Sequence, residues 1–211
     1  MTDLPEFPIR AFAKADPSPD PRFYATPRFV AHIDDSAVRA VAELYGTLLP
    51  PGGRVLDLMS SWISHLPEEV TYAEVVDLGL NGGELAANPR LARHVVQDLN
   101  RDPVLPVEDD AFDGACCCVS VQYLEQPVAV MHEMRRVLKA GAPFAVTFSD
   151  RRFPTKAVLI WQAATNDRAD LVGLYLARAG FSSIEKRQVH GRDRGGDPLW
   201  AVVGRAPDGA R

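Results

Sequence analysis

Short apolar runs alternate with amphipathic segments along most of the chain. The runs are rich in Val and Leu, as expected of strands buried on both sides, whereas the amphipathic segments repeat their apolar residues at helical spacing. Strands are predicted over residues 54–59, 73–80, 95–100, 112–121, 144–149, 183–190 and 199–206. Helices are predicted over residues 35–48, 83–94 with an interruption at Pro89, 127–141, a stretch from about Lys156, and 169–181.

This alternation is typical of an α/β fold with a doubly wound, mostly parallel sheet and helices on both faces. The Gly- and Asp-rich segment 191–197 has the composition of a turn, so the last two strands are predicted to form an antiparallel C-terminal hairpin. We therefore expect a seven-stranded sheet. The first 28 residues are rich in proline and lack periodicity, which favours an extended arm over a core element.

Charge and composition narrow the class of partner. The 211 residues carry a formal net charge of -5, which argues against a nucleic-acid partner because binding phosphates requires a basic surface. No apolar run reaches the roughly 20 residues of a membrane span, and the N-terminal residues lack a signal-peptide pattern. A cytoplasmic location is therefore expected. No group of histidines, cysteines and acids has metal-ligand spacing, so no metal is expected.

The three cysteines are consecutive, at positions 116–118. Neighbours on a strand point to opposite faces, so Cys116 and Cys118 share one face and Cys117 takes the other. Their spacing fits neither a disulfide framework nor a metal site. The simpler interpretation is that they fill a strand buried on both sides, and a reactive thiol is the alternative.

The carboxyl ends of the first four predicted strands carry the candidate ligand-binding residues, because ligands of a doubly wound sheet bind there. An acid or amide after the second strand suits a ribose diol, since it accepts hydrogen bonds from two hydroxyls. An acid after the third strand can accept from the exocyclic amine of a base, and an apolar neighbour can cover the ring. The four ends are 57–61, 79–81, 98–100 and 120–123.

The block from Val95 to Ser149 resembles a known family. "DLN…LP…DDAFD", a strand, a helix ending in "EMRRVLKAG" and the strand "FAVTFS" follow the order and spacing of class I S-adenosylmethionine-dependent methyltransferases. The likeness is to the small-molecule or quinone-methylating type (methyltransferase type 11) and extends loosely over residues 50–205. It implies a Rossmann-like methyltransferase fold and S-adenosylmethionine as cofactor.

By this resemblance, several residues at the strand ends bind the cofactor. Asp98 would bind the adenine amine and Leu99 would pack on the ring. The methionine end would be flanked by Ser120, Val121 and Gln122. Asp57, which ends the first strand, is interpreted as a ligand-proximal acid, and a cap on a following helix is its alternative.

Two positions depart from the family pattern. Its acid-x-Gly-x-Gly loop lets the backbone approach the cofactor closely, and this chain has Met59, Ser60 and Ser61 there instead. These three residues remain candidates for cofactor binding, with a turn of different shape forced by Met59. The ribose-binding acid of the family falls on Gly79, so Asn81 or Glu84 is expected to bind the diol.

The acceptor side is less defined. The resemblance implies that residues 1–35 form an arm or lid over the pocket of a domain spanning 36–211. Candidates for a catalytic base are Tyr24, His32 and Tyr123, although His32 is equally compatible with a hydrogen bond to the backbone. The basic segment 151–156 either holds an anionic acceptor or is a solvated turn. His65 is interpreted as structural.

The favoured function is methyl transfer from S-adenosylmethionine to a small organic acceptor by in-line displacement, in which no protein nucleophile is needed. Aromatic residues near the predicted pocket favour a small acceptor, and a homodimer is left open. The first alternative is a degenerate member of the family that binds cofactor or a partner without catalysis, because the loop glycines are missing. A dinucleotide oxidoreductase is a distant third, since no G-x-G-x-x-G is present.

Overall fold

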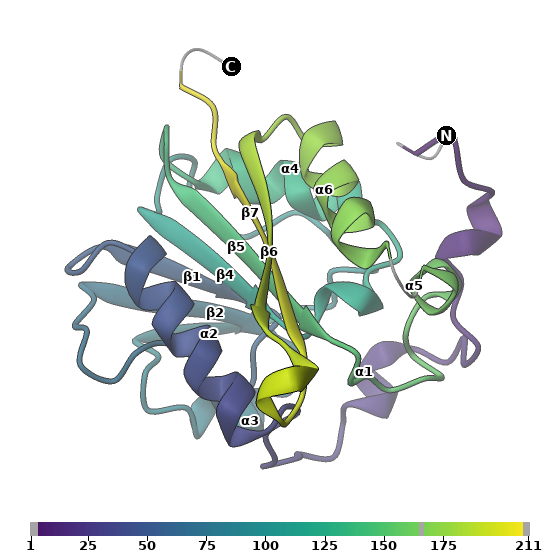
Figure 1. Ribbon diagram of the computed structural model, residues 1–211, viewed down its shortest axis with the longest axis horizontal. Coiled ribbons are helices and arrows are strands. Elements are labelled where there is room, and N and C mark those ends of the chain that lie inside the picture. Colours follow the sequence, from purple (N-terminus) through teal and green to yellow (C-terminus); the bar gives the residue numbers. More distant parts are fainter. Residues whose placement is uncertain (1–3, 165–166, 209–211) are drawn as a thin grey trace.

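The computed structural model describes residues 4–164 and 167–208, so the ends of the predicted arm (1–3) and of the predicted domain (209–211) lie outside it. The predicted seven-stranded sheet is confirmed, with the strand order β3-β2-β1-β4-β5-β7-β6 (Figure 1). Strands β1 to β5 pair in parallel, and β7 pairs antiparallel with both β5 and β6. The strands are β1 Arg54–Leu58, β2 Glu74–Gly79, β3 Arg93–Val96, β4 Gly114–Cys118, β5 Pro143–Ser149, β6 Ser182–His190 and β7 Leu199–Arg205.

Three long helices follow the predicted pattern. In α2 the Asp34 side chain caps the helix by accepting hydrogen bonds from the backbone N–H groups of Ser36 and Ala37, at 2.9 and 3.1 Å. Two other predicted helices are shorter than expected: α3 ends three residues before Pro89, which cannot continue a helix, and α5 has five residues. The α-helices are α1 Asp20–Phe23, α2 Asp35–Leu48, α3 Gly82–Ala86, α4 Pro127–Val137, α5 Leu159–Ala163 and α6 Arg168–Arg178.

The two faces of the sheet have separate apolar layers. On one face, α2 packs against alternate residues of the central strands, such as Val55 and Val75. On the other face, α4 and α6 pack against the intervening residues, such as Leu56 and Val76. The expectation of helices on both faces is therefore confirmed. Because helices cover both faces, a ligand can reach the sheet at the strand ends.

Strand β4 lies at the centre of the sheet and contains the three cysteines. All three are buried, and their alternation is as predicted, because Cys116 and Cys118 join the layer beneath α2 and Cys117 joins the opposite layer. Burial raises the pKa of each thiol. A protonated and inaccessible thiol is unreactive, so the packing interpretation fits these residues better than the reactive-thiol alternative.

Residues 4–34 form the arm, and we use this name for them below. They contain only two short helical turns, η1 Ile9–Phe12 and α1 Asp20–Phe23. The arm begins beside α6, where Phe12 contacts Tyr175 at 6.3 Å between ring centroids. It then follows α5 and passes below the carboxyl ends of the parallel strands (purple in Figure 1).

Candidate functional site

A cavity of about 570 Å³ opens where the parallel strands end. This volume is within the usual range of small-molecule pockets, about 300–1,000 Å³. We call its two parts the strand end and the arm end. The strand end is lined by 59–61, 78–81, 97–100 and 118–120, and the arm end by arm residues between Asp20 and His32 together with 150–154, the segment after β5.

The loop after β1 departs from the predicted alternation. All residues from Leu58 to Glu74 are described, and none of them is in a helix. Asp57 therefore does not cap a helix after β1. Met59 has φ +58°, in the left-handed region that favours glycine. The methionine therefore occupies a conformation of the kind a glycine would adopt, at a cost in strain.

Gly79, at the end of β2, allows this loop to lie where it does. A Cβ atom at this position would be 2.8 Å from the backbone oxygen of Ser60. The Ser60 hydroxyl itself donates to the Ile63 carbonyl at 3.0 Å. The loop backbone thus fills the space in which the family's ribose-binding acid would begin its side chain, and this accounts for the two sequence departures together.

Below the loop, two carboxyl groups are buried side by side. Asp57 and Asp77 are register partners on the parallel strands β1 and β2, and both are at most 2% exposed. Neither oxygen of Asp77 has a hydrogen-bond partner among the described residues, and Asp57 accepts one weak bond from the Cys116 thiol at 3.4 Å. Burial raises the pKa of Asp57, and burial together with the charge of Asp57 raises the pKa of Asp77 well above its usual value. Neither residue lines the cavity.

The ends of β3 and β4 provide the polar and apolar groups predicted for an adenine. Asp98 and Leu99 both line the cavity, and one Asp98 carboxylate oxygen accepts from the Asn100 backbone N–H at 3.0 Å. Ser120 also lines the cavity. Its hydroxyl lies within hydrogen-bond distance of the Met59 carbonyl, just after β1, and of the Cys118 carbonyl at the end of β4, so it connects the ends of the two strands. Val121 and Gln122 are buried behind the cavity and do not line it.

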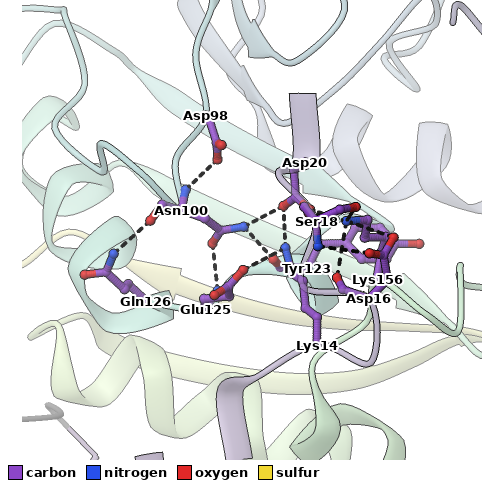
Figure 2. Close-up of polar contacts among 10 residues, drawn as sticks. All are labelled: Lys14, Asp16, Ser18, Asp20, Asp98, Asn100, Tyr123, Glu125, Gln126 and Lys156. Carbon is purple, nitrogen blue, oxygen red and sulfur yellow. Dashed lines mark hydrogen bonds and ion pairs between the residues drawn. The ribbon is translucent and has the colours of Figure 1, made fainter. Parts of the chain in front are cut away.

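The Asn100 side chain connects the strand end to the arm. Its amide nitrogen donates to Asp20 of the arm and to the Tyr123 carbonyl, both at 2.9 Å, and its amide oxygen accepts from the Glu125 backbone N–H (Figure 2). Asp20 in turn contacts the ammonium groups of Lys14 and Lys156. Every polar group of Asn100 is therefore used, and the position of the arm depends on it.

Lys156 holds the arm from the segment after β5. Its side chain is 0% exposed and its ammonium donates to the Ser18 carbonyl at 2.6 Å and contacts the Asp16 carboxylate at 3.2 Å (Figure 2). Sequence reasoning offered either an anionic acceptor or a solvated turn for this residue, and both are wrong for Lys156. Buried lysines are costly unless paired, which explains why two acids of the arm surround it.

Asn81 and Glu84, the predicted ribose-binding residues, also hold the arm. The Asn81 side-chain oxygen caps α3, and its amide nitrogen donates to the Tyr24 carbonyl at 2.8 Å. Glu84 accepts from the Arg28 backbone N–H at 2.7 Å. Both residues line the cavity.

The arm end is built from aromatic rings. Tyr24 of the arm, Tyr123 after β4 and Phe153 after β5 have ring centroids 6.1 to 6.4 Å apart, and His32 lies 5.5 Å from Phe153. Burial raises the pKa of both tyrosines, which keeps the phenols protonated. Burial and the nearby charge of Arg28 lower the pKa of His32, which favours the neutral imidazole. All three candidate bases line the cavity.

His65 lines the same cavity, although sequence reasoning treated it as structural. Its Nε2 atom is buried without a hydrogen-bond partner among the described residues, and burial lowers its pKa to about 4. An unsatisfied buried nitrogen beside a cavity is available to a ligand. No sequence signal identified it, because its position depends on the irregular loop after β1.

The described residues form neither a metal-binding cluster nor a membrane-spanning helix. Residues 4–164 and 167–208 contain no group of three or more His, Cys, Asp or Glu side chains arranged to hold a metal ion. Within the same ranges, every helix is too short or too polar to span a bilayer.

Comparisons with known proteins agree with this geometry. Residues 58–146 match a family model described as a methyltransferase domain. Among solved structures, the 4+2 cyclase SpnF has a TM-score of 0.63 at 18% identity, with 82% of each chain covered. The phosphoethanolamine N-methyltransferase 2 of Haemonchus contortus, in complex with S-adenosyl-L-methionine, has a TM-score of 0.61 at 13% identity over 82% of this chain and 53% of that chain.

A S-adenosylmethionine-dependent methyltransferase from Aquifex aeolicus has a TM-score of 0.57 at 16% identity, over 82% of this chain and 98% of that chain. No protein of curated function matches the sequence. At these identities the structural likeness shows the fold alone, whereas the family model matches the segment that carries β2 to β4 and most of β5. Residues 58–146 therefore match the methyltransferase-domain family, and the chain as a whole has the Rossmann-like fold of class I S-adenosylmethionine-dependent methyltransferases.

Proposed function

We propose that this chain binds S-adenosylmethionine at the strand end and transfers its methyl group to a small organic acceptor held at the arm end. The observation that carries the proposal is that one continuous cavity joins the two ends. Asp98 and Leu99 would hold the adenine, and Ser61 and the His65 nitrogen that has no partner among the described residues would bind the amino-acid end. When bound, the cofactor supplies a methyl group already activated by its sulfonium.

The residues of the chain would position the acceptor and handle its proton. The residues of the arm end would hold the acceptor atom in line with the methyl group that the bound cofactor supplies, so that sulfur could leave with the electron pair of the carbon–sulfur bond. Where the acceptor loses a proton, we assign its removal to His32, because burial and the charge of Arg28 lower its pKa and so favour the neutral imidazole, the form that can accept a proton. Tyr24 and Tyr123 would remain protonated, and the Tyr123 hydroxyl oxygen already accepts from the Phe153 backbone N–H at 2.9 Å.

Calorimetric titration with S-adenosylhomocysteine tests the cofactor part. We expect micromolar binding to the unmodified protein and an affinity at least about tenfold lower in Asp98→Ala, because a hydrogen bond to a charged group is lost. Asp102→Ala is the matched control, since Asp102 is an exposed acid four residues away that does not line the cavity. Absence of binding to the unmodified protein would contradict the proposal.

Once an acceptor is turned over, His32→Gln tests the assignment of the base. We expect kcat to fall at least about a hundredfold while the affinity for S-adenosylhomocysteine is kept, because general-base catalysis typically contributes about that much. An unchanged kcat would remove His32 from proton transfer.

The second candidate function is cofactor or partner binding without methyl transfer. The strained conformation of Met59 in the loop after β1 favours this function. The chain is also similar in fold to a protein named as a cyclase, so the fold by itself does not establish methyl transfer. Met59→Gly with Ser61→Gly separates the two functions by calorimetry. A large gain in affinity for S-adenosylhomocysteine would favour a degenerate site, and a loss would favour an adapted one.

A further inference from the structure

Two arginines at the arm end have no counter-ion in the part of the chain that the structure describes. Arg28 of the arm and Arg152 after β5 both line the cavity, and neither forms an ion pair with any acid among residues 4–164 and 167–208. Each also has a buried guanidinium nitrogen without a hydrogen-bond partner in these ranges, Nη1 of Arg28 and Nε of Arg152. A buried N–H group that lacks an acceptor is costly, so a ligand that supplies acceptors would be favoured.

The acids that line the same cavity end do not neutralise these two charges. Asp20 is paired with two lysines, Asp150 is paired with Arg192, and Glu84 accepts from a backbone N–H group. The arm end therefore keeps an excess of positive charge beside aromatic rings, although the whole chain is acidic.

The rings define the shape of what binds there. The Arg28 guanidinium lies over the rings of Phe23, Tyr24 and Phe153, with its central carbon 4.7, 5.7 and 5.6 Å from their centroids. This stacking orients the guanidinium plane, which is the part that matches a carboxylate by two parallel hydrogen bonds. Tyr123, near Arg152, and His32, near Arg28, complete the enclosure.

We propose that the acceptor is a flat, conjugated molecule that carries a negatively charged group, and that Arg28 and Arg152 bind this group. The inference rests on the proposed function, because it names the class of acceptor for the same site. The charged group is a handle for binding, which leaves another atom of the acceptor facing the strand end for methylation.

Benzoate and benzamide are suitable probes, since they have nearly the same shape and differ in charge. We would titrate each by calorimetry into the protein saturated with S-adenosylhomocysteine. We expect benzoate to bind at least about tenfold more tightly than benzamide. Equal affinities, tighter binding of benzamide, or no binding of either probe at about 10 mM would overturn the inference.

Variants assign the charge preference to the two arginines. Arg28→Gln and Arg152→Gln should each reduce the preference for benzoate to below about threefold, whereas Arg22→Gln, an exposed arginine of the same arm outside the cavity, should keep it. Arg28 also donates to the Phe23 carbonyl, so Arg152→Gln is the test that does not loosen the arm. Thermal unfolding without ligand verifies that each variant is folded. A full preference in both variants would contradict the assignment.

Failure of this inference is distinguishable from failure of the proposed function. If S-adenosylhomocysteine does not bind, the proposed function fails, and the same two probes titrated into the ligand-free protein decide the charge preference by themselves. If S-adenosylhomocysteine binds and the probes show no preference for benzoate, only the acceptor class is wrong.

Discussion

The two sides of the strand end differ in how their polar groups are satisfied. On the β3–β4 side, Asn100 uses its whole amide to join Asp20 of the arm to the segment after β4. On the β1–β2 side, Asp57 and Asp77 lie buried with three carboxylate oxygens unpartnered among the described residues, under a loop that holds Met59 in a left-handed conformation. The fixed side keeps the family's sequence pattern, and the strained side is where the pattern is missing. Strain that persists beside a cavity is a common property of functional sites.

Breaking the fixed side should have the largest effect. Asp20→Asn would leave Lys14 and Lys156 buried without their shared carboxylate, and we expect the free energy of unfolding to fall by about 3 kcal/mol or more. Urea denaturation measures the change. Asp170→Asn is the control, because Asp170 pairs with Lys186 on the surface and its loss should matter little. A loss below about 1 kcal/mol for Asp20→Asn would mean that the network does not hold the arm.

Relieving the buried carboxyl pair should have an intermediate effect of opposite sign. Because the folded-state pKa of Asp77 is raised above its ordinary value of 3.8, the folded protein holds a proton that the unfolded chain has lost. Stability should therefore decrease as the pH rises from about 4 towards the raised pKa. Asp77→Asn should flatten this decrease and stabilise the protein by more than about 1 kcal/mol at pH 8.

The measurement is urea denaturation of both proteins from pH 5 to pH 9. The difference in stability between the two proteins should be smallest at the acidic end of this range, because the raised pKa of Asp77 favours the protonated carboxyl there and this form resembles the amide. Because Asp57 and Asp77 titrate as a pair, the pH dependence belongs to both. An Asp77→Asn variant that is less stable at every pH would mean that Asp77 is ionised and paired.

Relaxing the Met59 backbone should have the smallest effect. Met59→Gly removes the penalty of a left-handed non-glycine residue and should stabilise the protein by up to about 1 kcal/mol, less the packing lost with the side chain. Ser61→Gly is the matched control, because Ser61 does not have a positive φ. Glycine at this position only adds conformational freedom to the unfolded chain, which should destabilise the folded protein by about 0.5–1 kcal/mol. Thermal unfolding compares them, and equal destabilisation of both variants would show that Met59 is not strained.

Strands β1, β2, β4, β5 and β7 could be predicted from the sequence because they are largely buried and read as continuous apolar runs, and β6, which is largely exposed, could be predicted because a turn follows it. The exception is β3, predicted over 95–100 but observed at Arg93–Val96, since this edge strand pairs only with β2 and its residues are largely exposed. The hairpin and the α2 cap follow from local turn and capping residues.

The candidate site could be predicted only in part, since its irregular portions depend on contacts between distant segments. The shape of the loop after β1 depends on Gly79 from the next strand. The burial of Lys156 depends on acids of the arm about 140 residues earlier in the chain, with its ammonium bonded to Ser18 across a separation of 138 residues. Periodicity and local motifs carry no signal for such pairs, so His65 and Asp20 were not identified.

The cysteines of β4 can be used to measure how often the core of this protein opens. The sequence has three cysteines, all in the central strand and all buried. Cys118 lines the cavity, whereas Cys116 and Cys117 are at most 1% exposed and do not line it. An alkylating reagent can therefore reach Cys116 and Cys117 only when the middle of the sheet separates, so the rate at which these two thiols are labelled follows the opening of the core and not the fraying of the arm or of the edge strands. Ligands that bind the folded chain should slow that labelling in proportion to their occupancy, which makes a search for the acceptor possible without any assay of turnover.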